Sequence, residues 1–84
     1  MDNGHKYLIY GRSSCPFCSE AVQILRSLKI ESVFFDLEGD REFLDEAKAF
    51  YNRKTVPIVL KIDENTDIVR LIGGCDDLKG DLGD

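Results

Sequence analysis

The chain has 84 residues, of which 43% are hydrophobic and 32% charged, and its formal net charge is −5. This length allows one domain, residues 1–84, with the composition of an ordinary globular protein. The acidic balance argues against a general binder of nucleic acid or anionic membranes, and no apolar run approaches the roughly 18 residues of a membrane span.

The N-terminus and the cysteines indicate the compartment. Residues 1–5 are predicted to be a short, flexible polar tail, and they lack the basic-then-apolar pattern of a secretion signal. The chain has three cysteines, an odd number that does not make a secreted disulfide framework. We therefore expect a reducing, cytoplasmic environment.

The first half of the chain predicts a strand, a helix and a second strand. The apolar run of residues 7–10 is typical of a buried strand. After a loop at residues 11–14, Pro16 suits the first turn of a helix. Residues 32–37 form the second predicted strand. The helix is indicated by apolar residues at the i, i+3, i+4, i+7 spacing of one buried face, namely Ala21, Ile24, Leu25 and Leu28.

The second half predicts a helix, a strand hairpin and a short last helix. Asp40 is a suitable N-cap for the helix, and Arg53 and Lys54 at its end would suit the helix dipole. Residues 58–62 and 67–72 are predicted strands, and a short helix begins after the two glycines at 73 and 74. The apolar residues of the longer helix are a stripe of Phe43, Ala47 and Phe50, with Leu44 and Tyr51 beside it.

The element order β-α-β-α-β-β-α predicts an α/β fold. A strand, a helix and a strand favour a right-handed parallel crossover, and the last two strands favour an antiparallel hairpin. The expected result is a four-stranded mixed sheet flanked by helices on both faces, which is the thioredoxin-like architecture.

The Cys-Pro-Phe-Cys motif at residues 15–18 carries the chemistry. Two thiols separated by two residues at a helix start are a redox signature, because the helix dipole and free backbone N–H groups favour a thiolate there. Cys15 is the exposed candidate nucleophile, whereas Cys18 is more buried and suited to resolving a mixed disulfide. The alternative is half of a zinc site, but zinc takes four ligands and only Cys75 and His5 remain.

Two further segments are expected beside the thiols. At residues 55–57, a cis bond before Pro57 would turn the backbone of Val56 toward the thiols, and the competing interpretation is a trans proline that only begins an edge strand. At residues 73–77, the N–H groups of a helix start can receive a carboxylate and Asp76 could bind an ammonium group. An ordinary helix cap is the alternative there.

Three basic residues converge on the same place in the predicted fold. They are Arg12, three residues before the first thiol, and Arg53 and Lys54, directly before the proline segment. An arginine suits a carboxylate because its planar fork binds both oxygens. The alternative, solvated surface charge, is weaker because separate segments supply the residues.

Together these motifs resemble the glutaredoxin family. Residues 9–18 are similar to the family's active-site segment, residues 55–57 to its cis-proline motif and residues 73–78 to its glutathione-binding turn. The resemblance implies a monomeric enzyme that uses glutathione as co-substrate to reduce protein disulfides and protein–glutathione mixed disulfides, in redox homeostasis and as an electron donor to ribonucleotide reductase. No metal is expected, and neither nucleic acid nor a membrane is an expected partner.

The family's roles carry over to the matching positions. Cys15 would attack the mixed disulfide and become glutathionylated, and Cys18 would resolve protein disulfides. The backbone of Val56 would pair with the cysteinyl part of glutathione, two arginines would bind its glycyl carboxylate, and the segment 74–76 would hold its γ-glutamyl end. The implied glutathione-binding residues are Arg12, Phe17, Arg53, Thr55, Val56, Pro57, Gly74, Cys75 and Asp76.

The chain departs from the family pattern at several positions. Arg12 stands where lysine is usual, and Phe17 where tyrosine is commoner. The last helix is shortened, and its two nearby glycines make it marginal. Cys75 is interpreted as a buried packing residue, with a third reactive thiol as the alternative.

Other functions compete with this interpretation. An iron–sulfur cluster carrier is one, although family members of that kind typically have Gly after the first cysteine and Ser in place of the second. A thioredoxin-like hydrogen donor independent of glutathione is another, but it would lack the residues 73–77 turn and the basic cluster. The N-terminal domain of a glutathione transferase is a third.

Overall fold

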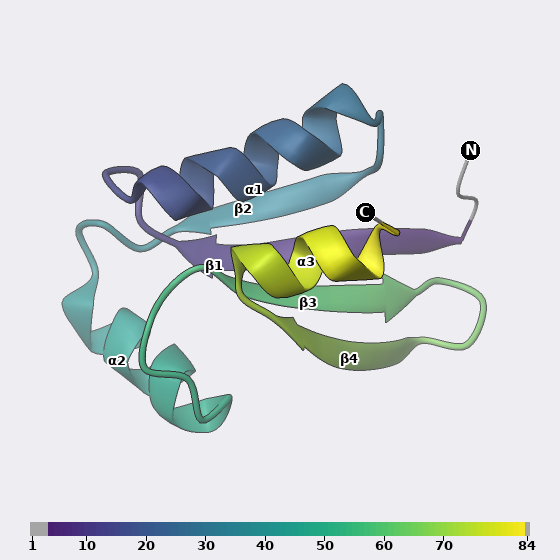
Figure 1. Cartoon of the computed structure of the whole chain (residues 1–84). Coiled ribbons are helices and arrows are strands. Elements are labelled where there is room, and N and C mark those ends of the chain that lie inside the picture. Colours follow the sequence, from purple (N-terminus) through teal and green to yellow (C-terminus); the bar gives the residue numbers. More distant parts are fainter. Residues whose placement is uncertain (1–3, 84) are drawn as a thin grey trace.

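The order of elements agrees with the sequence-based prediction. The computed structural model describes residues 4–83, and within that range no helix is long and apolar enough to cross a membrane. Figure 1 shows the elements in chain order: β1 (His5–Gly11), α1 (Pro16–Ser27), β2 (Ser32–Asp36), α2 (Arg41–Phe50), β3 (Ile58–Asp63), β4 (Ile68–Gly73) and α3 (Cys75–Asp81).

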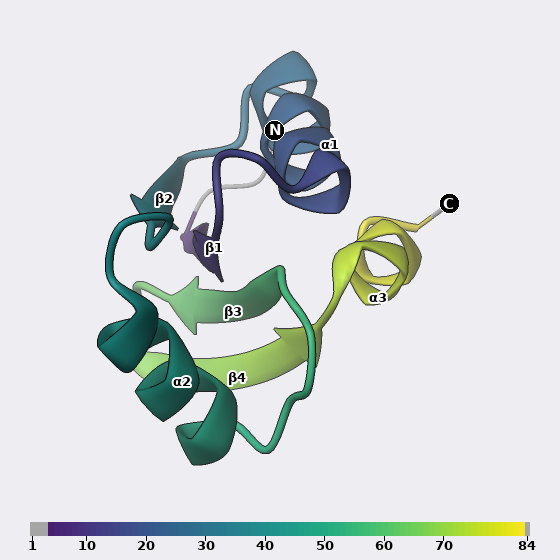
Figure 2. The ribbon, with the colours of Figure 1, turned by 90° about the vertical axis from the view of Figure 1, so that its left-hand side faces the viewer.

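The four strands form one mixed sheet in the order β2-β1-β3-β4. Strands β1 and β2 are parallel and are joined by the crossover helix α1, while β1 pairs with β3 and β3 with β4 in antiparallel fashion. Helices α1 and α3 cover one face and α2 lies on the other (Figure 2). The predicted sheet flanked by helices on both faces is therefore confirmed.

The main core lies between the sheet and the pair α1 and α3. Its buried members come from β1, α1, β3 and α3, and each alternate residue of β1 points into it. Burying side chains of this size supplies about 1.5–3 kcal/mol each and is what joins the helices to the sheet. These residues are Tyr7, Ile9, Ala21, Leu25, Val59, Cys75 and Leu78.

Helix α3 forms in spite of its low intrinsic propensity. Leu78 is fully buried, and the carboxylate of Asp81 accepts hydrogen bonds from the Tyr7 hydroxyl at 2.7 Å and from the Lys61 ammonium group at 3.2 Å. These contacts tie the C-terminal turn of α3 to β1 and β3. Tertiary packing outweighs the cost of Gly80 in the helix.

The predicted N-terminal tail is too long by at least one residue. His5 already belongs to β1, where it pairs in register with Asp63 of β3. Pairing with β3 extends β1 beyond its apolar run, because the backbone hydrogen bonds between strands do not require apolar side chains. Residues 1–3 of the predicted tail lie outside the described residues.

Helix α2 differs from its prediction at its end and in its buried face. Its N-cap is confirmed, since the Asp40 carboxylate accepts the Phe43 N–H at 3.0 Å. The helix ends at Phe50, however, so Arg53 and Lys54 lie beyond it. Of the predicted stripe only Ala47 is buried, together with its neighbour Leu44.

The reason for the different face is the position of α2 over one end of the sheet. Its aromatic residues gather around Tyr10 of β1, with ring centroids 6.3 Å away for Phe43 and 6.0 Å for Tyr51. The face that α2 turns to the sheet is narrow, and Phe43 and Phe50 stay 46% and 80% exposed. Two of the three residues of the predicted apolar stripe, Phe43 and Phe50, are therefore exposed to solvent.

The partly buried carboxylate of Asp81 makes the stability of the fold depend on pH. Its burial alone would raise the pKa of Asp81, but the hydrogen bonds from Tyr7 and Lys61 lower it below the ordinary value. Stabilisation from such a group is present above its unfolded pKa, about 3.9, and is lost as the pH falls through the folded pKa.

We expect Asp81→Asn to lower the free energy of unfolding by about 1–2 kcal/mol at pH 7, because hydrogen bonds to a charged group are lost. Urea denaturation at several pH values measures this, and the gap between the two proteins should narrow below about pH 4. Asp45→Asn, on the exposed side of α2, is the control and should change little. A gap that stays constant down to pH 2 would contradict the role of the charge.

Candidate active site

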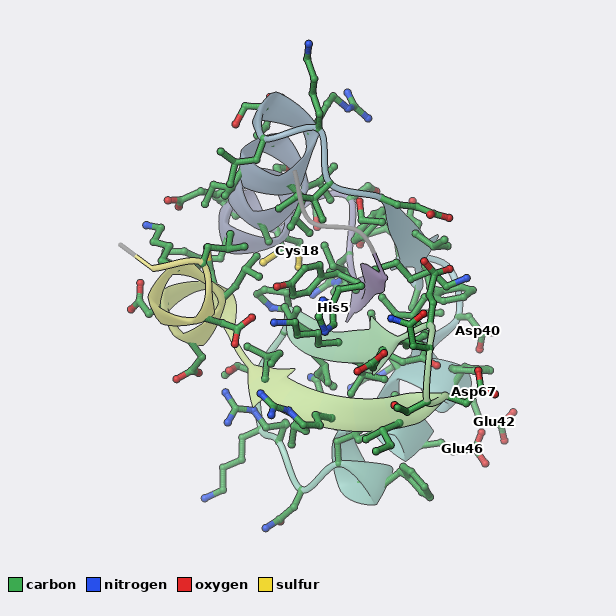
Figure 3. The ribbon with its side chains drawn as sticks, turned by 90° about the vertical axis from the view of Figure 1, so that its right-hand side faces the viewer. His5, Cys18, Asp40, Glu42, Glu46 and Asp67 are labelled. Carbon is green, nitrogen blue, oxygen red and sulfur yellow. The ribbon has the colours of Figure 1, made fainter. Side chains whose placement is uncertain are left out.

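The two thiols of the Cys-Pro-Phe-Cys motif lie at the start of α1, as predicted. Cys15 is the N-cap and is partly exposed, while Cys18 is fully buried one turn further on, beneath α1 (Figure 3). The helix approaches the end of β1 closely, because a Cβ atom at Gly11 would lie 2.5 Å from the Cys18 sulfur. Glycine at position 11 therefore makes room for the second thiol.

The surroundings shift the pKa values of the two thiols in opposite directions. Burial alone raises the pKa of Cys15, but hydrogen bonds from the Cys18 thiol and from the N–H groups of Cys18 and Phe17, together with the Arg12 charge, bring it below the ordinary value. Burial raises the pKa of Cys18 to about 12. Cys15 is therefore the thiol that ionises first as the pH rises, and Cys18 is the proton donor beside it.

The loop before β3 stands directly over the nucleophile. The Val56–Pro57 peptide bond is cis, and the Cys15 thiol donates a long hydrogen bond to the Val56 carbonyl at 3.9 Å. The predicted cis bond and its orientation toward the thiols are both confirmed. The backbone of Val56 thus lies next to the reactive sulfur.

A groove of about 220 Å³ opens beside Cys15 and brings most of the predicted residues together. Its walls come from the start of α1, the loop before β3 and the start of α3, three segments that lie at one end of the sheet (Figure 1). The residues lining it are Phe17, Arg53, Thr55, Val56, Pro57, Gly74, Cys75, Asp76 and Asp77. Eight of the eleven predicted site residues line one groove.

Asp77 belongs to this groove although it was not among the predicted site residues. Its carboxylate accepts the Gly74 N–H at 2.8 Å and lies 3.7 Å from the Arg53 guanidinium group. Gly73 has a φ of +128°, and a side chain there would collide with the Asp77 carboxylate. The sequence signal is the pair of glycines followed by acidic residues, a segment that the sequence predicts as a ligand-binding turn with Asp76, and not Asp77, as its functional carboxylate.

The position of Arg53 is set by the end of α2. The Arg53 N–H donates to the Lys48 carbonyl at 2.8 Å and the Asn52 N–H to the Ala49 carbonyl at 3.2 Å. With Asn52 at a φ of +55°, this pattern is a Schellman motif, which reverses the chain after a helix. The motif directs Arg53 to the groove, where its guanidinium lies beside Gly74. Sequence reasoning missed Asn52, whose left-handed preference was the available signal.

Arg12 is placed differently from Arg53. Its charge reaches Cys15, but its guanidinium donates to the Glu38 carboxylate at 2.8 Å and lines a separate hollow of about 390 Å³ between the active-site loop and α2. Lys54 is exposed and lines neither hollow. The predicted basic cluster is therefore spread over two adjoining surfaces.

Two carboxylates at the end of β2 hold the loop that precedes Cys15. Asp36 accepts the Ser13 N–H at 3.1 Å, and Glu38 accepts the Ser14 N–H at 3.0 Å. Hydrogen bonds from Ser14 and Arg12 lower the pKa of Glu38 to about 2. The sequence alone predicts no role for Asp36 or Glu38. The usable signal was that parallel neighbouring strands end at one edge of the sheet, so residues after β2 meet residues after β1.

The remaining predicted side chains lie in three different environments. Cys75 is 5% exposed and belongs to the core cluster, which agrees with its interpretation as a packing residue, and burial raises its pKa. Phe17 is 62% exposed on the rim of the groove. His5 lies at the opposite end of β1 from the thiols, paired with Asp63 at 3.8 Å. Among residues 4–83 no group of three or more His, Cys, Asp or Glu side chains could hold a metal ion.

Comparisons with known proteins agree with this architecture. The family model for glutaredoxin matches residues 8–65. A probable glutaredoxin of Synechocystis sp. is 32% identical over 74 residues, which cover 87% of this chain and 77% of that protein. The solution structure of a glutaredoxin from Brucella melitensis has a TM-score of 0.67 and 26% identity, covering 98% of this chain and 85% of the other.

A further likeness concerns the fold alone. The crystal structure of a buckwheat glutaredoxin–glutathione complex has a TM-score of 0.73 at 17% identity, covering 93% of this chain and 68% of that one. With these neighbours the predicted thioredoxin-like architecture is confirmed.

The hydrogen bond from Cys18 predicts a measurable property of Cys15. We expect Cys18→Ala to slow alkylation of Cys15 by iodoacetamide at pH 7 by about three- to tenfold, because one hydrogen bond of about 1 kcal/mol to the thiolate is lost. Since only the thiolate reacts, the midpoint of the rate against pH should move to higher pH. Arg12→Gln should move it in the same direction by less.

Cys75→Ser is the control, because that thiol is not bonded to Cys15, and it should leave the midpoint unchanged. The rate is followed by mass spectrometry of the Cys15 peptide. An unchanged midpoint in Cys18→Ala would show that the buried thiol does not stabilise the Cys15 thiolate.

Proposed function

The chain belongs to the glutaredoxin family, and on that premise we propose that it is a glutathione-dependent oxidoreductase for protein disulfides and protein–glutathione mixed disulfides. Membership in the family gives the thiol–disulfide chemistry. The observation that carries the finer proposal is a partly exposed Cys15 of lowered pKa beside the Val56 backbone, at the groove that holds eight predicted residues. That the buckwheat protein of the same fold is a glutathione complex supports the choice of co-substrate.

Deglutathionylation needs Cys15 alone. Its thiolate attacks the glutathione sulfur of a protein–glutathione disulfide, forming a Cys15–glutathione disulfide and releasing the protein thiolate, which takes up a proton. The thiolate of a second glutathione then attacks the glutathione sulfur on Cys15. Glutathione disulfide leaves and Cys15 returns as a thiolate, so two electrons pass from two glutathione molecules to the substrate.

Reduction of a protein disulfide uses both thiols. Cys15 attacks one sulfur of the substrate and forms a mixed disulfide with the substrate protein. Cys18 loses its proton and attacks the Cys15 sulfur, which releases the reduced substrate and leaves a Cys15–Cys18 disulfide. Burial keeps Cys18 protonated until that step, since its pKa is about 12. Two glutathione molecules then reduce the internal disulfide.

The groove suits a glutathione molecule in an extended conformation. The Val56 backbone, next to the Cys15 sulfur, would pair with the cysteinyl residue of glutathione. Arg53, on the groove wall, would bind the glycyl carboxylate, while Arg12, the other arginine that the family resemblance implies for it, is bound to Glu38. The segment 74–76 would hold the γ-glutamyl end, where the Asp76 carboxylate matches an ammonium group. Phe17, Thr55 and Pro57 would supply the remaining walls.

The proposed setting follows from the same chemistry. Reduction by glutathione requires a reducing compartment, and we propose the cytoplasm, with redox homeostasis and electron supply to ribonucleotide reductase as roles. The protein would act as a monomer on glutathionylated or disulfide-bonded proteins.

Activity measurements on two cysteine variants test the proposal. In a hydroxyethyl-disulfide assay with glutathione and glutathione reductase, we expect Cys15→Ser to be inactive, because no nucleophile remains at the groove. Cys18→Ser should keep deglutathionylation, since serine still offers a hydrogen-bond donor to Cys15, but should lose reduction of a protein disulfide.

Asp67→Asn, in the exposed turn between β3 and β4, is the control and should retain both reactions. Replacing glutathione and its reductase with thioredoxin reductase tests the glutathione-independent alternative. Full turnover in that system, or normal activity of Cys15→Ser with glutathione, would refute the proposed mechanism.

A further inference from the structure

Glu38 is anchored in place by three neighbouring segments of the chain. One carboxylate oxygen accepts the Ser14 N–H at 3.0 Å, and the Glu38 N–H donates to the Asp36 carboxylate, also at 3.0 Å. The Leu37 N–H donates to the Gly11 carbonyl at 2.8 Å, which extends the pairing of β1 and β2 to the residue before Glu38. The carboxylate is thus directed at the active-site loop.

The second carboxylate oxygen of Glu38 is bound to Arg12. It accepts from the guanidinium at 2.8 Å, and the side chains are 35% and 46% exposed. The low pKa of Glu38, about 2, keeps the carboxylate charged across the physiological range. The other charged side chains of this hollow are Arg41, Asp45 and Lys48.

The two arginines implied for one substrate carboxylate are therefore unequally available. Arg53 is 3.7 Å from Asp77, beyond direct hydrogen-bond distance, so its donors can turn to a ligand in the groove. Arg12 is already bound to a carboxylate with the same geometry and charge as the one a substrate would bring. A substrate carboxylate gains Arg12 only by displacing Glu38.

We propose that Glu38 is a specificity-determining residue that competes with the substrate's carboxylate for Arg12. The inference rests on the proposed function, because it concerns the choice among disulfides at that site. With Glu38 in place, Arg12 contributes little to the preference for a disulfide bearing a glycyl carboxylate over a neutral analogue. Without the Glu38 charge, Arg12 becomes a second cation for that carboxylate.

The expected size of the change in selectivity follows from the solvent exposure of the Arg12–Glu38 pair. Exposed ion pairs are weak, so we expect a change of up to about fivefold in relative kcat/KM. The change should be a gain in selectivity, in contrast to the loss that removal of a merely structural residue would cause.

The experiment compares two substrates that differ in one charge. One is a peptide joined by a disulfide to glutathione, and the other is the same peptide joined to glutathione ethyl ester, whose glycyl carboxylate is neutral. Wild type, Glu38→Gln, Arg12→Gln and the double variant are assayed for kcat/KM with each. Glutamine keeps the oxygen that accepts the Ser14 N–H, so the loop anchor survives in Glu38→Gln.

We expect Glu38→Gln to raise the acid-over-ester ratio of kcat/KM by about two- to fivefold, mainly through a lower KM for the acid. In the Arg12→Gln background the same change should have no effect on the ratio. Asp45→Asn is the matched control, because it removes an equal charge from the same hollow and should leave the ratio at the wild-type value.

The opposite results are also informative. An unchanged or lower ratio in Glu38→Gln, an equal rise in Asp45→Asn, or a rise that persists without Arg12 would overturn the inference while wild type remains active. A wild-type protein that reduces neither substrate with glutathione would instead overturn the proposed function, and this inference with it.

Discussion

The close approach of α1 to the end of β1 is the contact on which the rest of the site depends. Gly11 has no side chain, so the Cys18 sulfur packs against the strand where a Cβ atom would lie 2.5 Å away. This contact removes Cys18 from water and raises its pKa to about 12. It also places the N-cap of α1, Cys15, at the edge of the core, where helix N–H groups and the Cys18 proton stabilise a thiolate. One packing contact thereby gives the two thiols opposite properties.

The other parts of the site are arranged around this helix start by backbone features. The loop before β3 brings Val56 to the Cys15 sulfur, the Schellman motif after α2 brings Arg53 to the groove, and Asp77 closes the turn before α3. The helix start also lies over a core shared with α3, since α1 and α3 pack against the same sheet face. The stability of α3 and the shape of the groove therefore depend on the same buried residues.

How much could be predicted from the sequence depends on the range of the interaction. Periodicity and caps were sufficient for the element order and for Asp40, because both are local. Most of the groove followed from the family resemblance carried by residues 9–18, 55–57 and 73–78 together. The pairing of Arg12 with Glu38 was missed, because no local pattern indicates it and it follows only from the meeting of two strand ends in the sheet. The buried face of α2 also could not be predicted, since it depends on where the helix lies over Tyr10.

The Arg12–Glu38 pair affects the chemistry through the charges around the thiols. The chain carries a net charge of −5, so a cation near Cys15 must act against an acidic background. Arg12 lowers the pKa of Cys15, but Glu38 is paired with Arg12 at 2.8 Å and neutralises much of the field that a distant anion would feel. A thiolate in the immediate vicinity keeps the benefit of Arg12, because short-range interactions are screened least. An incoming carboxylate, by contrast, meets an arginine that is already paired. The pair thus separates stabilisation of the nucleophile from attraction of the substrate, two functions that an unpaired cation at position 12 would perform together.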